Sequence, residues 1–267
     1  MVKCQVVMDA LERIAPKRLA EDWDNPGLLV GAFQQDIRKI LVCLDVSDGV
    51  VEQAIREGAD MIVAHHPLIF KGLKKIRTDL PLGARLAQLL KHDIAVAAAH
   101  TNLDIVVGGV NDVLAEAIGL SKLSTFVITS QEEDGTVESL GRIGSLPAPM
   151  AVEDFARQVR ASLPASHVRL VHAGPRPVRK VALCSGSGAE FIQKAVFMGA
   201  DAYVTGDVKY HEAQTAVELG IHVIDAGHFA TEFPVVEVLR QRLSEELAEY
   251  HMEVIADKES QDFFTVI

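Results

Sequence analysis

Short, continuously apolar runs that alternate with amphipathic stretches predict an α/β protein. In the first half of the chain, the runs that indicate buried strands are Lys39–Leu44, Met61–Ala64 and Ile94–Ala99. Between the first and second of these runs, Ser47 or Asp48 can cap a helix that continues to about Glu57. Gly58 then stands where a helix commonly ends in a left-handed residue.

The second half of the chain has a similar pattern. The apolar runs that predict its strands are Val181–Cys184, Ala202–Thr205 and Ile221–Ile224. Before them, Phe126–Ile128 and Val137–Ile143 predict the two strands of a hairpin. After a long helix, Met252–Ala256 predicts a closing strand.

The two halves align with each other. An offset of 141 positions needs no gap over some 25 residues, and it pairs Lys39 with Lys180, Cys43 with Cys184 and Gly58-Ala59-Asp60 with Gly199-Ala200-Asp201. We therefore predict two similar α/β domains in a tandem pseudo-repeat. The predicted boundaries are 1–121 for the first unit, 122–139 for a connection and 140–267 for the second unit, whose C-terminal segment can pack back on the first.

The composition of the chain argues against several classes of protein. The 267 residues carry a formal net charge of −11, which argues against a protein that binds nucleic-acid backbones. The chain has no signal-peptide pattern and no apolar run of the roughly 18 residues that span a membrane. Cys4, Cys43 and Cys184 are odd in number and lie mostly in apolar segments, so we expect buried thiols and a cytoplasmic protein.

Histidine and carboxylate side chains follow several predicted strands. The groups are His65-His66, His100 with Asp104, Asp207, and His228 with Glu232. Ligands of open α/β sheets bind at the carboxyl ends of strands, and groups four apart at a helix start share one face. Mixed imidazole and carboxylate ligation suits zinc, manganese, iron, cobalt or nickel, and two ions about 3.5–4 Å apart are a common hydrolytic device.

Each of these groups also has an ordinary structural explanation. The His pair could be polar surface, His100 a core histidine or a residue that orients a ligand, and Asp207 a helix cap. Asp225 is more often a loop carboxylate, and we do not include it. Ser185-Gly186-Ser187-Gly188 could cradle a phosphate but lacks the end of a Walker motif, so a plain turn fits better. Lys71, Lys74 and Lys75 could attract a phosphate or form a solvated face.

Several motifs together resemble one family, the GTP cyclohydrolase 1 type 2 homologues. They are Trp23-Asp24-Asn25-x-Gly27-Leu28, His65-His66-Pro67, His100-Thr101-Asn102-Leu103-Asp104, Gly206-Asp207 with Glu212-Ala213, and Asp225-x-Gly227-His228-x-x-x-Glu232. The resemblance runs nearly end to end. It implies two similar α/β domains with a site for two divalent metal ions in the cleft between them, and a ring-shaped homohexamer. The ligands that it implies are His65, His66, Asp104, His228 and Glu232, with His100 beside the metals.

The leading hypothesis is a metal-dependent hydrolase that acts on a nucleotide or a related heterocycle or phosphate compound. The alternative is a scaffold or adaptor in which metal ions hold the domains together without turnover. A third reading is a two-domain α/β protein without metal. The sequence identifies neither a general acid or base nor the metal.

Overall fold

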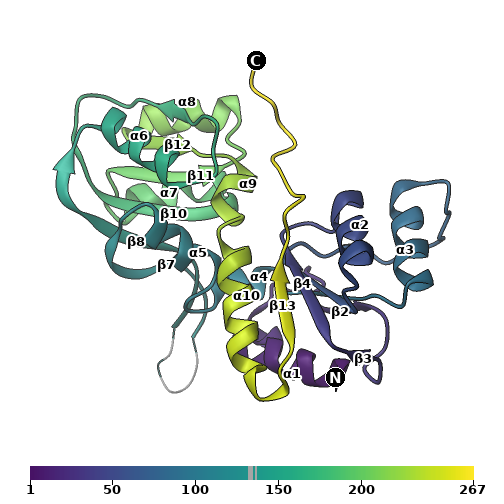
Figure 1. Cartoon of the computed structure of the whole chain (residues 1–267). Coiled ribbons are helices and arrows are strands. Elements are labelled where there is room, and N and C mark those ends of the chain that lie inside the picture. The colour runs from purple at the N-terminus through teal and green to yellow at the C-terminus, as the bar shows by residue number, and fades with distance from the viewer. Residues whose placement is uncertain (132–134, 136) are drawn as a thin grey trace. The chain divides into compact units, whose positions relative to one another are not determined.

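A computed structural model of the chain describes residues 1–131, 135 and 137–267 (Figure 1). The described chain divides into two compact units. The first unit comprises Met1–Val106 and Val236–Gln261, and the second comprises Val107–Val235 and Asp262–Ile267. Within the predicted connection, residues 132–134 and 136 lie outside the described residues. The domain boundaries 1–121, 122–139 and 140–267 remain a prediction from the sequence.

The first unit is built on a five-stranded sheet with the strand order β13-β4-β5-β6-β2. Strands β13, β4, β5 and β6 are parallel, and β2 runs antiparallel to β6. A small antiparallel sheet pairs β1 with β3. The strand bounds are β1 Val2–Lys3, β2 Gly27–Val30, β3 Asp36–Ile37, β4 Lys39–Cys43, β5 Met61–Ala64, β6 Ala95–Ala98 and β13 Glu253–Ala256.

Helices connect and cover these strands. Ser47 caps α2 as predicted, because its side chain accepts a hydrogen bond from Val50 N at 3.3 Å. Gly58 ends the helix with a φ of 69°, which favours glycine. The helix bounds in this unit are α1 Cys4–Ile14, η1 Lys17–Leu19, α2 Asp48–Glu57, α3 Pro81–Lys91, α4 Thr101–Ile105, α10 Val235–Glu246 and η3 Ala248–Tyr250.

The second unit is built on a six-stranded sheet with the strand order β7-β8-β10-β11-β12-β9. Its centre, β10, β11 and β12, is parallel, and β8 and β9 flank this centre in antiparallel orientation. The predicted hairpin is confirmed, since β7 pairs antiparallel with β8. The strand bounds are β7 Ser121–Gln131, β8 Val137–Met150, β9 Arg169–Val171, β10 Val178–Ser187, β11 Ala202–Gly206 and β12 His222–Asp225.

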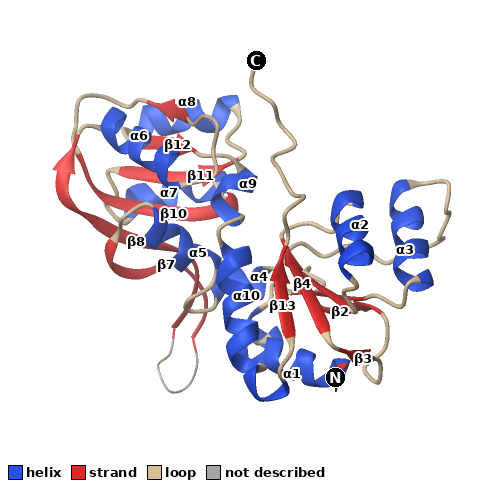
Figure 2. Ribbon diagram, viewed as in Figure 1, coloured by secondary structure: helices blue, strands red, loops and turns tan. Residues whose placement is uncertain are grey.

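Alternate residues of the second sheet enter two separate cores. Leu183 and Val204 belong to a cluster that includes residues of α5, α6 and α9, whereas Cys184 and Tyr203 belong to one that includes residues of α7 and α8. Helices therefore cover both faces, as expected for strands without polar alternation (Figure 2). The helix bounds here are α5 Val110–Ala117, α6 Val152–Ser162, η2 Ala189–Phe191, α7 Ile192–Phe197, α8 Tyr210–Leu219 and α9 His228–Glu232.

The sequence repeat reappears in backbone hydrogen bonds. The Asp60 carboxylate accepts from Arg38 N and Lys39 N at 2.8 and 3.1 Å. At the same offset of 141, the Asp201 carboxylate accepts from Arg179 N and Lys180 N at 3.1 and 2.9 Å. These carboxylates tie the entry of one parallel strand to the entry of its neighbour in each unit.

Two other expectations can be compared with the structure. Cys4, Cys43 and Cys184 are buried free thiols, as predicted. Burial raises the pKa of the Cys4 thiol to about 11, so this group stays protonated near neutral pH. Among the described residues, no helix combines the length and the apolar character that a membrane crossing requires.

Candidate metal centre

The adjacent histidines follow β5 without leaving the sheet ladder. His65 N donates to Cys43 O at 3.1 Å and His66 N donates to Leu44 O at 2.9 Å. Their ring centroids are 4.9 Å apart, and His65 is fully buried. The end of this buried strand therefore presents two imidazoles close together.

His100 joins them from the end of β6. One ligand atom from each of His65, His66 and His100 lies within 4.8 Å of the others, a group that is able to hold a metal ion. Asp104, in α4, places its Oδ1 3.7 Å from His65 Nε2, and its carboxylate is buried. The first unit thus brings all four of its predicted site residues to one place.

An oxygen acceptor fixes the Nδ1 atom of each imidazole in this cluster. His65 Nδ1 donates to Ala99 O at 2.9 Å, and His66 Nδ1 donates to Asp45 Oδ1 at 2.8 Å. His100 Nδ1 donates to Asp24 Oδ1, also at 2.8 Å. Because these oxygens can only accept, Nδ1 is the donor in each ring, and in the neutral tautomer Nε2 carries the lone pair that metals bind.

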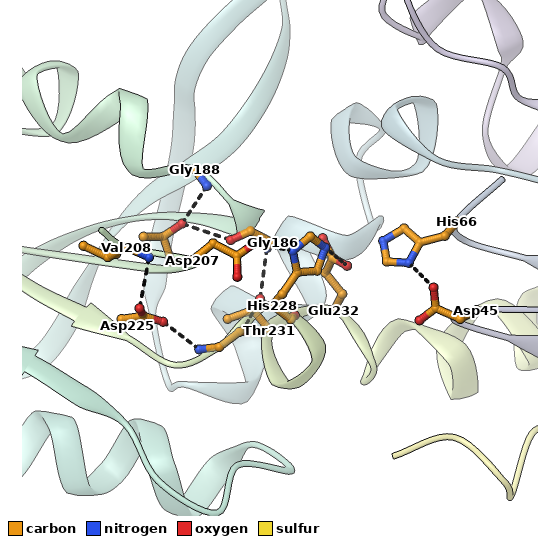
Figure 3. Close-up of polar contacts among 12 residues, drawn as sticks. Asp45, His66, Gly186, Gly188, Asp207, Val208, Asp225, His228, Thr231 and Glu232 are labelled. Carbon is orange, nitrogen blue, oxygen red and sulfur yellow. Dashed lines mark hydrogen bonds and ion pairs between the residues drawn. The ribbon is translucent and has the colours of Figure 1, made fainter. Parts of the chain in front are cut away.

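The second unit repeats this arrangement around His228. Its Nδ1 donates to Asp207 Oδ2 at 2.8 Å, and its Nε2 lies 3.1 Å from Glu232 Oε2, one helical turn along α9 (Figure 3). Glu232 is buried, whereas His228 and Asp207 are partly exposed. The i, i+4 spacing predicted to put these two groups on one face is confirmed.

The backbone around His228 is tightly constrained. Asp207 has a φ of 56°, a left-handed conformation that Asp tolerates better than most residues. A Cβ on Gly206 would lie 2.7 Å from His228 N and 2.8 Å from Gly186 O. A Cβ on Gly186 would collide with the Glu232 carboxylate. Glycine at both positions is therefore a steric requirement of this half of the candidate centre.

The donor set fits a divalent transition metal. Metal-binding histidines commonly donate their second ring nitrogen to a carboxylate or a carbonyl, which fixes ring orientation and raises ligand basicity. His65, His66, His100 and His228 all have this pattern. A bound cation would also compensate the charges of the buried carboxylates Asp104 and Glu232.

The Asp24 carboxylate accepts hydrogen bonds from Thr101 as well as from His100. Besides His100, it accepts from Thr101 N at 3.0 Å and from Thr101 Oγ1 at 2.5 Å. Burial alone would raise the pKa of Asp24, but the hydrogen bonds from His100 and Thr101 outweigh it and lower the pKa to about 2. Asp24 therefore remains a carboxylate at any pH at which the protein is used.

The remaining candidates have structural roles. Asp225 accepts from Val208 N and Gly227 N at 3.0 Å each, which orders the loops that follow β11 and β12. In the Ser185–Gly188 segment, Gly186 N donates to Thr231 Oγ1 and Gly188 N donates to Thr205 Oγ1, each at 3.0 Å. Those amides are directed at protein oxygens, which favours the plain turn over a phosphate cradle.

The sequence analysis did not predict the orienting role of Asp24 and Asp45. They lie 76 and 21 positions from their histidines. The available signals were local: Asp24 stands in the turn cluster after Trp23, and Asp45 directly follows a buried strand. Asp207 was a candidate for the site, and the structure places it on His228.

Comparison with known proteins places this geometry in a family. The chain matches the Duf34/NIF3 (NGG1p interacting factor 3) family over residues 2–262. A Clostridium perfringens protein named GTP cyclohydrolase 1 type 2 homolog is 35% identical over 266 residues, covering 100% of both chains. The solved structure of a Bacillus cereus protein related to NIF3 superimposes with a TM-score of 0.94 at 29% identity, covering 100% of this chain and 99% of that one. A Staphylococcus aureus hypothetical protein gives a TM-score of 0.93 at 30% identity, covering 99% of each chain.

Proposed function

Because the chain belongs to the Duf34/NIF3 family, we propose that it is a metal-dependent hydrolase of a nucleotide or a related heterocycle or phosphate compound. The observation that carries the proposal is the shared orientation of four histidines, each with Nδ1 donating to an oxygen, in side-chain groups that are able to hold a metal ion. The name shared by the relatives, GTP cyclohydrolase 1 type 2 homolog, supports a nucleotide-like substrate for this chain.

We propose that ligands from both units bind two divalent ions. His65, His66 and Asp104 are the proposed ligands of the first unit, and His228 and Glu232 those of the second. The His65–His66–His100 group supports adding His100 as a further ligand or as a neighbour of the ions. In this proposal, the domains share the site, as the sequence resemblance implies.

The protein groups around the site have definite tasks. Divalent ions in such a site would lower the pKa of water and stabilise charge on the attacked centre. Asp45, Asp24 and Asp207 accept the Nδ1–H bonds of His66, His100 and His228, which holds each ring in one orientation. Asp104 and Glu232 supply negative charge in a buried setting, where its interaction with a cation is strong.

The first experiment measures metal content and turnover together. Purified protein is assayed for zinc, manganese, iron, cobalt and nickel, and the loaded protein is tested against GTP, damaged nucleotides and phosphoesters. We expect about two ions per chain and hydrolysis of at least one compound. His66→Ala should lose metal and abolish turnover, whereas His92→Ala, an exposed histidine of the same unit, should change neither.

Failure has a clear form. Two retained ions without turnover across the whole panel would contradict the hydrolase. Retention of both ions by His66→Ala and by His228→Ala would contradict the shared site. His211, an exposed histidine of α8, provides the matched control in the second unit.

A metal-stabilised scaffold is the second candidate. The observation that favours it is the division of the candidate ligands between the two units. In a scaffold, removal of metal with a chelator should lower the melting temperature or dissociate the oligomer, with no activity to lose. The ring-shaped homohexamer also stays a proposal, which sedimentation equilibrium of the metal-loaded protein tests directly.

A further inference from the structure

Two large aromatic side chains lie exposed beside the histidine cluster of the first unit. Trp23 is 59% exposed and Phe70 is 42% exposed. Their ring centroids are 5.8 Å apart, and they lie 6.1 and 6.3 Å from the ring of His100. The three rings therefore form a triangle with one corner in the candidate metal centre.

Hydrogen bonds beside each aromatic residue hold the pair in position. Asp24, next to Trp23, is bound to His100 and Thr101, as described above. Asn25 Nδ2 donates to Ile69 O, next to Phe70, at 2.6 Å. The turn that carries Trp23 is thus tied both to the end of β6 and to the loop that carries Phe70.

Such rigidity is unusual for side chains that remain in water. Large apolar groups are normally ordered by burial, and their exposure sacrifices that gain. Here polar contacts of the neighbouring residues restrain the backbone that carries two substantially exposed aromatic rings. Aromatic faces that are fixed in advance bind planar rings well, because little conformational entropy is lost on binding.

The loop that carries Phe70 is positively charged, whereas Trp23 lies between Asp22 and Asp24. Lys71, Lys74 and Lys75 follow Phe70 in the same loop and are exposed. They stand out in a chain with a net charge of −11. A ligand with a planar ring and phosphate groups would find an aromatic surface and cations on one loop.

We propose that Trp23 and Phe70 form a stacking surface for the purine ring of a nucleotide whose reacting group lies at the histidine cluster. This inference rests on the proposed hydrolase function and specifies its substrate class. Because the two aromatic rings are tilted by 53°, the purine ring stacks on one of them and meets the other at its edge, and the lysines of the Phe70 loop attract the phosphates. Binding by stacking requires no turnover, so it can be measured separately.

The chain provides its own probe, because Trp23 is the single tryptophan. Metal-loaded protein is excited at the red edge of tryptophan absorption and titrated with GTP, and with sodium tripolyphosphate as a ring-free control. We expect saturable quenching by GTP and none by tripolyphosphate. Phe70→Ala should weaken GTP binding by about 5- to 100-fold, the usual range for loss of one stacking partner.

Phe33→Ala is the matched control. Phe33 is a phenylalanine of the same unit with a similar exposure of 47%. It should leave the dissociation constant for GTP unchanged. Isothermal titration calorimetry of both variants and of Trp23→Ala checks the affinities without relying on fluorescence.

Three results would overturn the proposal. They are the absence of saturable quenching by GTP, equal quenching by tripolyphosphate, and an unchanged affinity in both Phe70→Ala and Trp23→Ala. A change of oligomeric state in Phe70→Ala without a change in GTP affinity would assign the pair to an interface between copies. Quenching by GTP without any turnover would retain the stacking surface and reject the hydrolase, whereas turnover of GTP unaffected by either variant would do the reverse.

Discussion

At the end of β5 the first unit carries His65 and His66, whereas at the equivalent end of β11 the second unit carries Gly206 and Asp207. The strands themselves are alike. In the first unit β4, β5 and β6 are parallel to one another and β2 is their antiparallel neighbour, and in the second unit β10, β11 and β12 are parallel to one another and β9 is their antiparallel neighbour. The two units therefore have separate sheets with a similar parallel centre, and they differ in the residues that follow the carboxyl ends of those strands.

Packing explains the difference at the first of these positions. In the second unit, the start of α9 approaches so closely that Gly206 has no room for a Cβ. In the first unit, the same position holds a complete imidazole, whose Nδ1 reaches Ala99 O. A metal-ligand histidine is thus sterically possible at the end of β5 and impossible at the end of β11, where His228 in α9 is offered instead.

The two units keep the same hydrogen bonds where the parallel strands begin and carry different residues where these strands end. Asp60 and Asp201 make matching hydrogen bonds at strand entries. The strand exits carry different residues, namely His65-His66 in the first unit and Gly206-Asp207 in the second.

Gly206→Ala should destabilise the protein by about 3 kcal/mol, because the new methyl group would overlap backbone atoms of His228 and Gly186. Urea unfolding of the metal-free protein measures the change. Gly72→Ala is the control, since a Cβ there would meet nothing within 4 Å, and it should stay within about 0.5 kcal/mol. Equal stability of the two variants would refute the steric explanation.

Asp45→Asn and Asp207→Asn should each weaken metal binding by about 10- to 100-fold, because each carboxylate orients a proposed ligand. Competition with a chromophoric chelator gives the affinities. Glu52→Gln and Glu116→Gln remove an exposed carboxylate from the same two units and should have no effect. An effect confined to Asp45→Asn would mean that His228 is not a ligand.

Asp60→Ala and Asp201→Ala should cost about 1.5 kcal/mol each, because each removes two backbone hydrogen bonds to a charged acceptor. Thermal unfolding beside Glu116→Ala provides the measurement and its baseline. Unequal costs would show that the matching contacts are not energetically equivalent.

His222 should give the second unit a weak sensitivity to acid between pH 7 and 5. Burial lowers the pKa of His222 below 6.5, although its bond to Arg176 O opposes the shift. The folded state therefore prefers the neutral ring. Its contribution to stability is complete above pH 6.5 and is lost as the pH falls through the lower folded value. Ala95 is the corresponding residue of the first unit, because Ala95 N donates to the main-chain oxygen of Asp60 just as His222 N donates to that of Asp201.

Unfolding of His222→Gln should vary less between pH 7 and 5 than unfolding of the unmodified chain, and an identical pH dependence would contradict this.

Periodicity and punctuation in the sequence predicted the framework well. The strand at Met61–Ala64 matches β5 residue for residue, and Ser47 and Gly58 mark the ends of α2. These features depend on neighbours in the chain, which a sequence displays directly. The family resemblance is likewise confirmed by full-length relatives.

Contacts between distant residues escaped the sequence analysis. His100 and His228 do not occupy equivalent positions in the backbone hydrogen-bond registers of the two units. Ala99 N donates to Ala64 O and Ala226 N to Thr205 O, so Gly227 corresponds to His100. His100 stands at the N-cap position of α4, whereas His228 is the first residue of α9. The two histidines therefore differ by one position relative to the end of the preceding strand. No local sequence pattern shows this shift.

The position of β13 has a consequence for the order in which the protein is made. This strand, Glu253–Ala256, pairs with β4 and supplies the edge of the first unit's sheet. Most of the second unit, in contrast, lies in the uninterrupted stretch Val107–Val235. Domains usually form in the order of their synthesis. Here the ribosome must release nearly the whole chain before the N-terminal sheet can be completed, so the later-synthesised half can mature first.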